Sequence, residues 1–184
     1  MITAEQAGRV RLLALDVDGV LTDNGIWVAP IEGDRVEFKR FDIQDGLGLV
    51  ILRRTGIDVA WVSGRHSEAT ELRAKELRIP TLIQESGARK LPAMQRLLAD
   101  KKVTWAEVAY VGDDLADLPV LRRAGLPITV ANGCPEAKGL AAWVTSAAGG
   151  QGAVREVVEA LLRARGEWDT AVAQYLADCG EAPA

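Results

Sequence analysis

The sequence has few of the residues that build the commonest metal and disulfide sites. Among its 184 residues there are only one histidine and two cysteines. His66, Cys134 and Cys179 lie far apart in the chain, without the short spacing of zinc ligands. We therefore expect neither a zinc site nor a disulfide framework.

An excess of basic residues and a long apolar run are also missing. The net charge is −4 at pH 7, so the chain lacks the broad basic surface typical of nucleic-acid binding. No apolar run approaches the ~20 residues of a membrane helix. The first ten residues, with Glu5 and Arg9, do not resemble a signal peptide. We expect a cytoplasmic protein with no nucleic-acid partner and no membrane partner.

The composition that remains, 48% hydrophobic and 26% charged, is that of a globular protein. Short apolar runs that end in glycine or polar residues alternate with segments of helical length and period. The strand-like runs are 12–15, 57–62, 81–83, 107–111, 127–131 and 143–145, and the helix-like segments are 45–55, 67–78, 90–100 and 153–165. This alternation predicts an α/β fold with three layers and a mostly parallel sheet, forming a single domain over residues 1–184.

Two segments depart from the alternation. Residues 25–41 read as a β-hairpin with its turn centred on Gly33-Asp34. The hairpin follows the first strand, so we expect it to overhang the site, although it is too small to form a cap domain. The tail, about 167–184, is expected to continue as a helix through Leu176 and to fray at Gly180 and Pro183.

The first strand leads directly into two carboxylates, Asp16 and Asp18. Residues two apart on a strand share a face, and ligands of open α/β sheets bind at the carboxyl ends of the strands. At ~5 Å and an effective dielectric of about 20 the two charges repel by roughly 3 kcal/mol. Mg²⁺ would relieve this repulsion, because it prefers oxygen ligands and often binds substrate phosphate as well. The alternative is a pair of aspartates that only form a turn.

Polar groups also end the other strands. Asp113 follows the run 107–111 and can complete a metal site if that strand neighbours the first, with Asp114 and Asp117 in support. Helix capping is the alternative function of Asp114. Ser63 ends the run 57–62 and offers a hydroxyl beside the amides of a helix start, a favourable place for phosphate. Lys90 opens a helix, where a bound anion would offset the unfavourable dipole.

These residues match, in order, the four motifs of the haloacid dehalogenase superfamily of phosphohydrolases. The motifs are Asp16-Val17-Asp18-Gly19-Val20-Leu21-Thr22, Val62-Ser63-Gly64-Arg65, Lys90, and Gly112-Asp113-Asp114 with Asp117. The segments 41–48, 113–120 and 149–157 further resemble the capless subfamily that hydrolyses 3-deoxy-D-manno-octulosonate 8-phosphate in lipopolysaccharide sugar biosynthesis. The resemblance implies a Rossmann-like core, Mg²⁺ as cofactor, a sugar acid phosphate as substrate and a homotetramer. In that assembly the hairpins pack together, and a neighbour's segment or C-terminal tail helps to close the site. Trp27, Val28, Val36 and Phe38 fit such a buried hairpin surface, and the alternative is that they only pack on their own domain.

The same resemblance implies a division of roles. Asp16 would be the nucleophile that forms an aspartyl phosphate, and Asp18 would protonate the departing alcohol and then activate water. Mg²⁺ would be held by the Asp16 and Asp113 side chains and the Asp18 carbonyl, while Ser63 and Lys90 neutralise the phosphoryl group. A metal-bound carboxylate stays ionised for attack, whereas crowding by negative charge would let Asp18 keep a proton near neutral pH.

The residues that select the substrate are less defined by sequence. Arginine matches a substrate carboxylate with two parallel donors, and the candidates are Arg65 and Arg155. Gly46 lies in the segment 41–48 that resembles the subfamily and is a further substrate-binding candidate. The segment 84–90 is slightly longer than the family pattern, which makes Arg89 the alternative to Lys90 as phosphate ligand.

Two other functions remain open from the sequence. A phosphatase for a nine-carbon 2-keto sugar acid phosphate would carry similar motifs. A phospho-acceptor module also combines clustered aspartates, a hydroxyl and a lysine on a parallel sheet, but it would be phosphorylated without turnover.

Overall fold

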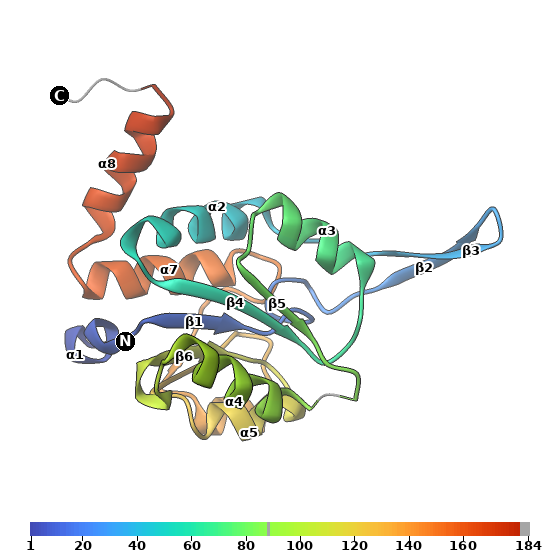
Figure 1. Cartoon of the computed structure of the whole chain (residues 1–184), viewed down its shortest axis with the longest axis horizontal. Helices are drawn as coiled ribbons and strands as arrows, with labels where there is room; N and C mark the ends of the chain where they lie inside the picture. Colours follow the sequence, from blue (N-terminus) through green and yellow to red (C-terminus); the bar gives the residue numbers. More distant parts are fainter. Residues whose placement is uncertain (88, 181–184) are drawn as a thin grey trace.

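The fold is a six-stranded parallel sheet between two layers of helices, shown by a computed structural model that describes residues 1–87 and 89–180 (Figure 1). The strands of the sheet are β1 (Leu12–Leu15), β4 (Asp58–Ser63), β5 (Thr81–Gln84), β6 (Val108–Val111), β7 (Leu126–Thr129) and β8 (Trp143–Val144). Their order is β5-β4-β1-β6-β7-β8, and every pairing is parallel. The predicted three-layer α/β fold is confirmed.

The helices divide between the two faces of the sheet. On one face lie α1 (Ala4–Arg9), α2 (Ile43–Leu52), α3 (Glu68–Glu76), α7 (Ala153–Ala164) and α8 (Trp168–Asp178). On the other lie α4 (Lys90–Lys101), α5 (Leu118–Leu121) and α6 (Pro135–Leu140). Short 3₁₀ turns η1 (Arg53–Thr55), η2 (Trp105–Glu107) and η3 (Leu115–Asp117) complete the elements. None of the described helices is long and apolar enough to cross a membrane.

The central strand β1 explains why two cores form. Its four residues are all fully buried, with Leu13 and Leu15 in one core and Leu12 and Ala14 in the other. Alternate side chains of a strand face opposite sides of the sheet, so a continuous apolar run fits a strand covered on both faces. The next position, Asp16, is the first polar one and lies where the strand leaves the sheet.

Most helix ends follow local chemistry. Gly56 ends the α2–η1 segment in the left-handed conformation (φ 79°), as its sequence context predicts. Helix α7 carries an apolar stripe of buried residues, Val154, Val157, Val158, Leu161 and Leu162. The short helices α1, α5 and α6 are not predicted from the sequence, because one to two turns give too little periodicity; α1 is fixed by a capping box between Thr3 and Gln6.

The hairpin of β2 (Trp27–Ile31) and β3 (Asp34–Phe38) projects from the body of the protein as an arm (Figure 1). The predicted turn at Gly33-Asp34 is wrong by one residue. Asp34 pairs with Ile31, and the turn residues are Glu32 (φ 52°) and Gly33 (φ 92°). A two-residue turn with both φ values positive matches the twist of the strands, and this decides the register.

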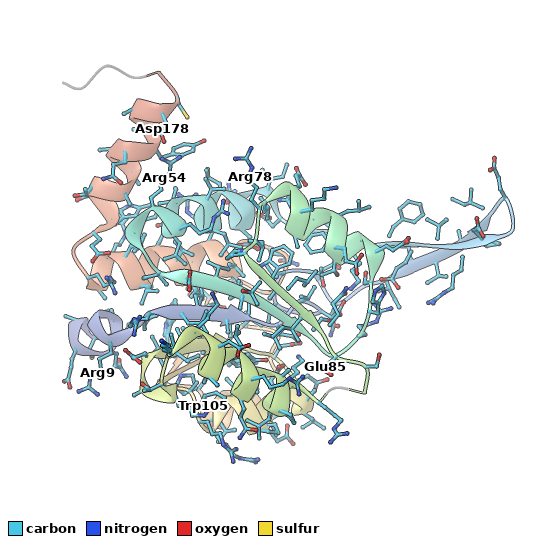
Figure 2. All side chains as sticks on the ribbon, viewed as in Figure 1. Arg9, Arg54, Arg78, Glu85, Trp105 and Asp178 are labelled. Carbon is cyan, nitrogen blue, oxygen red and sulfur yellow. The ribbon has the colours of Figure 1, made fainter. Side chains whose placement is uncertain are left out.

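The C-terminal helix α8 follows the predicted course as far as Asp178. It leans on η1, where Arg54 forms an ion pair with Asp178, and Figure 2 shows these two residues side by side. Gly180 has a positive φ of 97°. The predicted fraying at Pro183 lies outside the described residues.

Candidate active site

The predicted site residues of three strands meet at one edge of the sheet. Strand β1 lies between β4 and β6, so Asp16, Ser63 and Asp113 follow neighbouring strand ends. The amide of Asp16 still donates to the Val111 carbonyl at 2.9 Å, which extends the β1–β6 pairing into the site. The expected neighbourhood of these two strands is confirmed.

Glycine lets the loop after β1 pass close to Asp113. Gly19 has φ +92°, and a Cβ there would lie 2.1 Å from the Asp113 carboxylate. The loop is supported from behind by Gly149, where a Cβ would lie 1.9 Å from the Gly19 carbonyl oxygen. Asn132 connects them, because it donates to the Gly19 carbonyl and accepts from the Gly149 amide. The segment from 149 onward thus buttresses the loop that carries Asp16 and Asp18.

Lys90 lies buried among carboxylates. Its Nζ is 2.6 Å from Asp16 Oδ1 and 2.7 Å from Asp117 Oδ1. Burial by itself would lower the pKa of Lys90, but the two carboxylates outweigh it and raise the pKa above its usual value. Arg89 precedes the helix with an exposed side chain and does not line the cavity, so Lys90 is the cation that the fold brings to Asp16.

Asp117 has a structural function. Its Oδ1 accepts from Lys90 and from the Tyr110 hydroxyl at 2.6 Å, and its Oδ2 accepts from the amides of Asp113 and Asp114. Both oxygens are therefore satisfied by the protein. Asp114 accepts from the Leu115 amide at the start of η3, which is the capping function considered above for this residue.

A divalent cation fits beside Asp16 and Asp113. Carboxylate oxygens of Asp16, Asp113 and Asp117 lie within 4.8 Å of one another, and all three residues are buried. Asp113 Oδ1 is buried without a hydrogen-bond partner among the described residues. Burial, with the Asp117 charge second, raises the pKa of Asp16 well above its usual value and that of Asp113 to about 6. A hard cation would satisfy the unpaired oxygen and offset this cost.

Asp18 has positive neighbours. Its Oδ1 is 2.6 Å from Lys39 Nζ and 3.9 Å from an Arg65 nitrogen. Its Oδ2 is 3.5 Å from the Ser63 hydroxyl. The expected crowding of Asp18 by negative charge is therefore wrong, because the hairpin brings a lysine to it that sequence distance concealed. Lys39 lies in the predicted second strand of the hairpin, and nothing in the sequence around it indicates a contact with the site.

The segment after β4 is arranged differently from the expected phosphate cradle. Ser67 caps α3 and donates from its hydroxyl to Glu37, so the start of this helix does not line the cavity. Gly64 and Arg65 do line it, with the Ser63 hydroxyl bonded to the Arg65 amide and carbonyl. Helix α3 begins at Glu68 with Ser67 as its cap, in agreement with the predicted segment 67–78, so the amides of its first turn lie beyond the loop that follows Ser63.

Two predicted substrate-binding residues lie away from the site. The Arg155 guanidinium pairs with Glu159 at 2.7 Å and stacks on Trp168 at 5.1 Å, on the α7–α8 side. At Gly46 a Cβ would meet the Arg73 side chain at 2.7 Å, so this glycine allows α2 to approach α3. Neither residue lines the cavity, because helix packing, which the sequence does not reveal, directs both of them elsewhere.

The cavity above the carboxylates has a volume of about 170 Å³. Its lining consists of Asp16, Asp18, Asn24, Gly64, Arg65, Lys90, Asp113, Asp114, Ala116 and Asp117. Sites for whole organic ligands usually measure ~300 Å³ or more. This cavity therefore suits a phosphoryl group with its metal, and the rest of a larger substrate would lie outside it. A larger hollow of about 670 Å³ between β3 and α3 contains neither Asp16 nor Asp113 in its lining.

Comparison with known proteins agrees with this geometry. Residues 81–157 match the haloacid dehalogenase-like hydrolase family. The chain is 41% identical over 171 residues to the 3-deoxy-D-manno-octulosonate 8-phosphate phosphatase KdsC of Escherichia coli K12, covering 93% of this chain and 89% of that protein. The Yersinia pestis protein of the same name is 41% identical over 161 residues, covering 88% of this chain and 84% of that protein.

Solved structures are similar as well. The 3-deoxy-D-manno-octulosonate 8-phosphate phosphatase of Moraxella catarrhalis, in complex with magnesium, phosphate and KDO, superposes with a TM-score of 0.87 at 39% identity and covers 94% of this chain and 97% of that one. The cobalt-bound phosphatase of Haemophilus influenzae gives a TM-score of 0.79 at 33% identity, over 88% of this chain and 92% of that one.

Proposed function

The chain belongs to the 3-deoxy-D-manno-octulosonate 8-phosphate phosphatase family of haloacid dehalogenase-like hydrolases, and from this we propose how its residues divide the reaction. It is a phosphomonoester hydrolase that uses Mg²⁺ and releases phosphate from 3-deoxy-D-manno-octulosonate 8-phosphate. The observation that carries this conclusion is the 41% identity over 93% of the chain.

Asp16 is the nucleophile of the proposed mechanism. Its carboxylate lies at the floor of the cavity beside Lys90, and attack on phosphorus would give an aspartyl phosphate. Lys90 neutralises charge on the transferring group and is already within ion-pair distance of the attacking carboxylate. Ser63 acts on the phosphoryl group indirectly, because its hydroxyl holds the backbone of the loop at Gly64 and Arg65 that lines the cavity.

Asp16 and Asp113 would hold the Mg²⁺ together with the Asp18 carbonyl, and the buried Oδ1 of Asp113, which has no hydrogen-bond partner among the described residues, supports this assignment. When bound, the ion supplies positive charge to the phosphoryl oxygens. Phosphate monoesters hydrolyse so slowly in water that enhancements reach ~10²¹, which makes this electrostatic stabilisation the main requirement of the site.

Asp18 transfers the proton. It protonates the alcohol that leaves as the aspartyl phosphate forms, and it then takes a proton from the water that hydrolyses this intermediate. Arg65 lines the cavity and remains the candidate for the carboxylate of the sugar acid, although two of its donors already bind Glu37.

Substrate assays test this function. Purified protein with Mg²⁺ should release phosphate over many turnovers from 3-deoxy-D-manno-octulosonate 8-phosphate, and Asp16→Asn should abolish release. Faster release from a nine-carbon 2-keto sugar acid phosphate would favour the alternative substrate. A single stoichiometric phosphorylation without turnover would indicate a phospho-acceptor module.

A homotetramer formed through the hairpin is also part of the proposal. Trp27, Val28 and Phe38 are each about half exposed on the projecting arm, at 54%, 48% and 51%. Trp27 and Phe38 pair directly across the hairpin and share one face, and Val28 lies on the other face. Exposed apolar residues on a projecting arm are typical of protein–protein contact surfaces. Light scattering should give the mass of four chains, and Trp27→Asp should reduce it; a monomeric wild-type protein would contradict the proposal.

A further inference from the structure

Lys39 connects the hairpin to the site through a completely buried side chain. Its ammonium group lies 2.6 Å from Asp18 Oδ1, 3.2 Å from the Thr70 hydroxyl and 3.7 Å from Glu37 Oε1. These three partners belong to the loop after β1, to α3 and to β3. Burying a lysine costs free energy unless its charge is paired. The three contacts therefore indicate that the ammonium group has a fixed position.

The charges around Lys39 form a closed ring. Glu37 and Lys39 are two residues apart at the end of the hairpin, and Glu37 binds Arg65 through two hydrogen bonds of 2.6 and 3.0 Å. Arg65 in turn reaches Asp18, at 3.9 Å. Each acid of the ring therefore contacts both bases. The bidentate contact from Arg65 lowers the pKa of Glu37 to about 2, which keeps this member of the ring charged.

We propose that Lys39 is a positioning residue that fixes which oxygen of Asp18 transfers the proton. The inference rests on the proposed function of Asp18 and deepens it. An ammonium group has donors only, so the oxygen it contacts must accept. With Oδ1 occupied by Lys39, the proton of the acid form is carried by Oδ2.

Oδ2 is the oxygen left free for the reaction, because both neighbouring cations, Lys39 and Arg65, lie on the side of Oδ1. The only described contact of Oδ2 is a long one, with the Ser63 hydroxyl at 3.5 Å. In the first step Asp16 forms its bond to phosphorus, and the bond between phosphorus and the alcohol oxygen breaks. The electron pair of that bond stays on the alcohol oxygen, which takes the proton from Oδ2 of Asp18. Misplacement of a reacting group by ~1 Å can cost about 100-fold in rate, so fixing Oδ2 matters.

The test compares two leaving groups. p-Nitrophenolate leaves without protonation, whereas the sugar alkoxide requires a proton. Because kcat/KM reports only the steps up to departure of the leaving group, it isolates the proton transfer to the alcohol from the later hydrolysis of the aspartyl phosphate. Lys39→Met should lower kcat/KM for 3-deoxy-D-manno-octulosonate 8-phosphate by roughly 100-fold and kcat/KM for p-nitrophenyl phosphate by less than about tenfold. Lys39→Arg keeps a donor-only cation and should bring the ratio of the two rates back toward that of the wild type.

The matched control is Lys101→Met. Lys101 forms an ion pair of 2.9 Å with Asp58 of β4, and neither residue lines the cavity. Its loss should therefore leave the ratio of the rates on the two substrates unchanged. Equal losses of kcat/KM on both substrates in Lys39→Met would show that Lys39 only supports the fold, and the inference would be overturned. An unchanged kcat/KM on the sugar phosphate would overturn it as well.

A second variant covers a failure of Lys39→Met to fold. Thr70→Val is nearly isosteric and removes the hydroxyl that holds Lys39 from α3. It should shift the ratio in the same direction, by about threefold or more, and an unchanged ratio would overturn the inference. The proposed function fails separately, if the wild-type protein does not hydrolyse the sugar phosphate or if Asp16→Asn remains active.

Discussion

The Nζ of Lys39 lies 2.6 Å from Oδ1 of Asp18, although the two residues are 21 positions apart in the chain. This contact makes the hairpin part of the site as well as a projecting arm. It also reverses the electrostatics expected at Asp18, because a buried lysine lies beside a carboxylate that we expect from the sequence to be crowded by negative charge.

Lys90 and Arg89 form a matched pair for mutation. Lys90→Met should lower kcat by about 100-fold or more, because the cation next to Asp16 is lost. Arg89→Met should change kcat by less than about threefold, since its side chain is exposed at the start of α4. Steady-state kinetics on the sugar phosphate check both. A larger loss in Arg89→Met than in Lys90→Met would assign the phosphate to Arg89.

Removal of the metal should stop the reaction, and Asp113 should set how tightly the metal binds. Chelation by EDTA is expected to abolish phosphate release, and added Mg²⁺ to restore it. In Asp113→Ala the Mg²⁺ concentration for half-maximal activity should rise by about tenfold or more, because a charged ligand is missing. The matched control is Asp58→Ala, a partly exposed aspartate on β4. An equal Mg²⁺ requirement in both variants would contradict the assignment.

Asp45 makes stability depend on pH. Burial raises the pKa of Asp45 to about 6, although its Oδ1 accepts from the Arg155 amide at 2.7 Å. The contribution of this group to stability is fully present below the usual aspartate pKa and is lost as the pH rises through about 6.

Asp45→Asn removes that titration. From pH 4 to pH 7.5 its free energy of unfolding should rise relative to wild type by up to about 3 kcal/mol, since two pKa units correspond to that amount. Urea denaturation at the two pH values measures the difference. Parallel pH dependence of the two proteins would show that Asp45 ionises normally.

Arg155 should matter for stability and not for the substrate. Its guanidinium packs on Trp168 and pairs with Glu159, so Arg155→Ala should cost about 1 kcal/mol in unfolding free energy. KM for the sugar phosphate should stay within about twofold. Arg65→Ala is the informative comparison, because Arg65 lines the cavity. A tenfold rise of KM in Arg155→Ala would show that Arg155 binds the substrate after all.

The sequence alone determines the sheet and the chemistry at its edge. Apolar runs that end in Asp16, Ser63 and Asp113 predict parallel strands whose polar ends lie together. Each run is visible within a few residues of sequence, and the carboxyl ends of parallel strands lie at the same edge of a sheet. The positions of the helices α2, α4 and α7 follow from their own periodicity and end signals. Lys90, too, is recognised from its place at a helix start.

The tertiary structure decides which charges meet. Lys39 and Glu37 carry no signal in the sequence, and both reach the site because the end of the hairpin packs against it. Arg155 and Gly46 lie in segments that resemble the family, yet helix packing directs them to α8 and α3. Asp16 and Asp18 show this division most clearly. The sequence determines their spacing at the end of one strand. Their partners, Lys90 for Asp16 and Lys39 for Asp18, lie on other elements, and only the packing of the folded core brings these elements close.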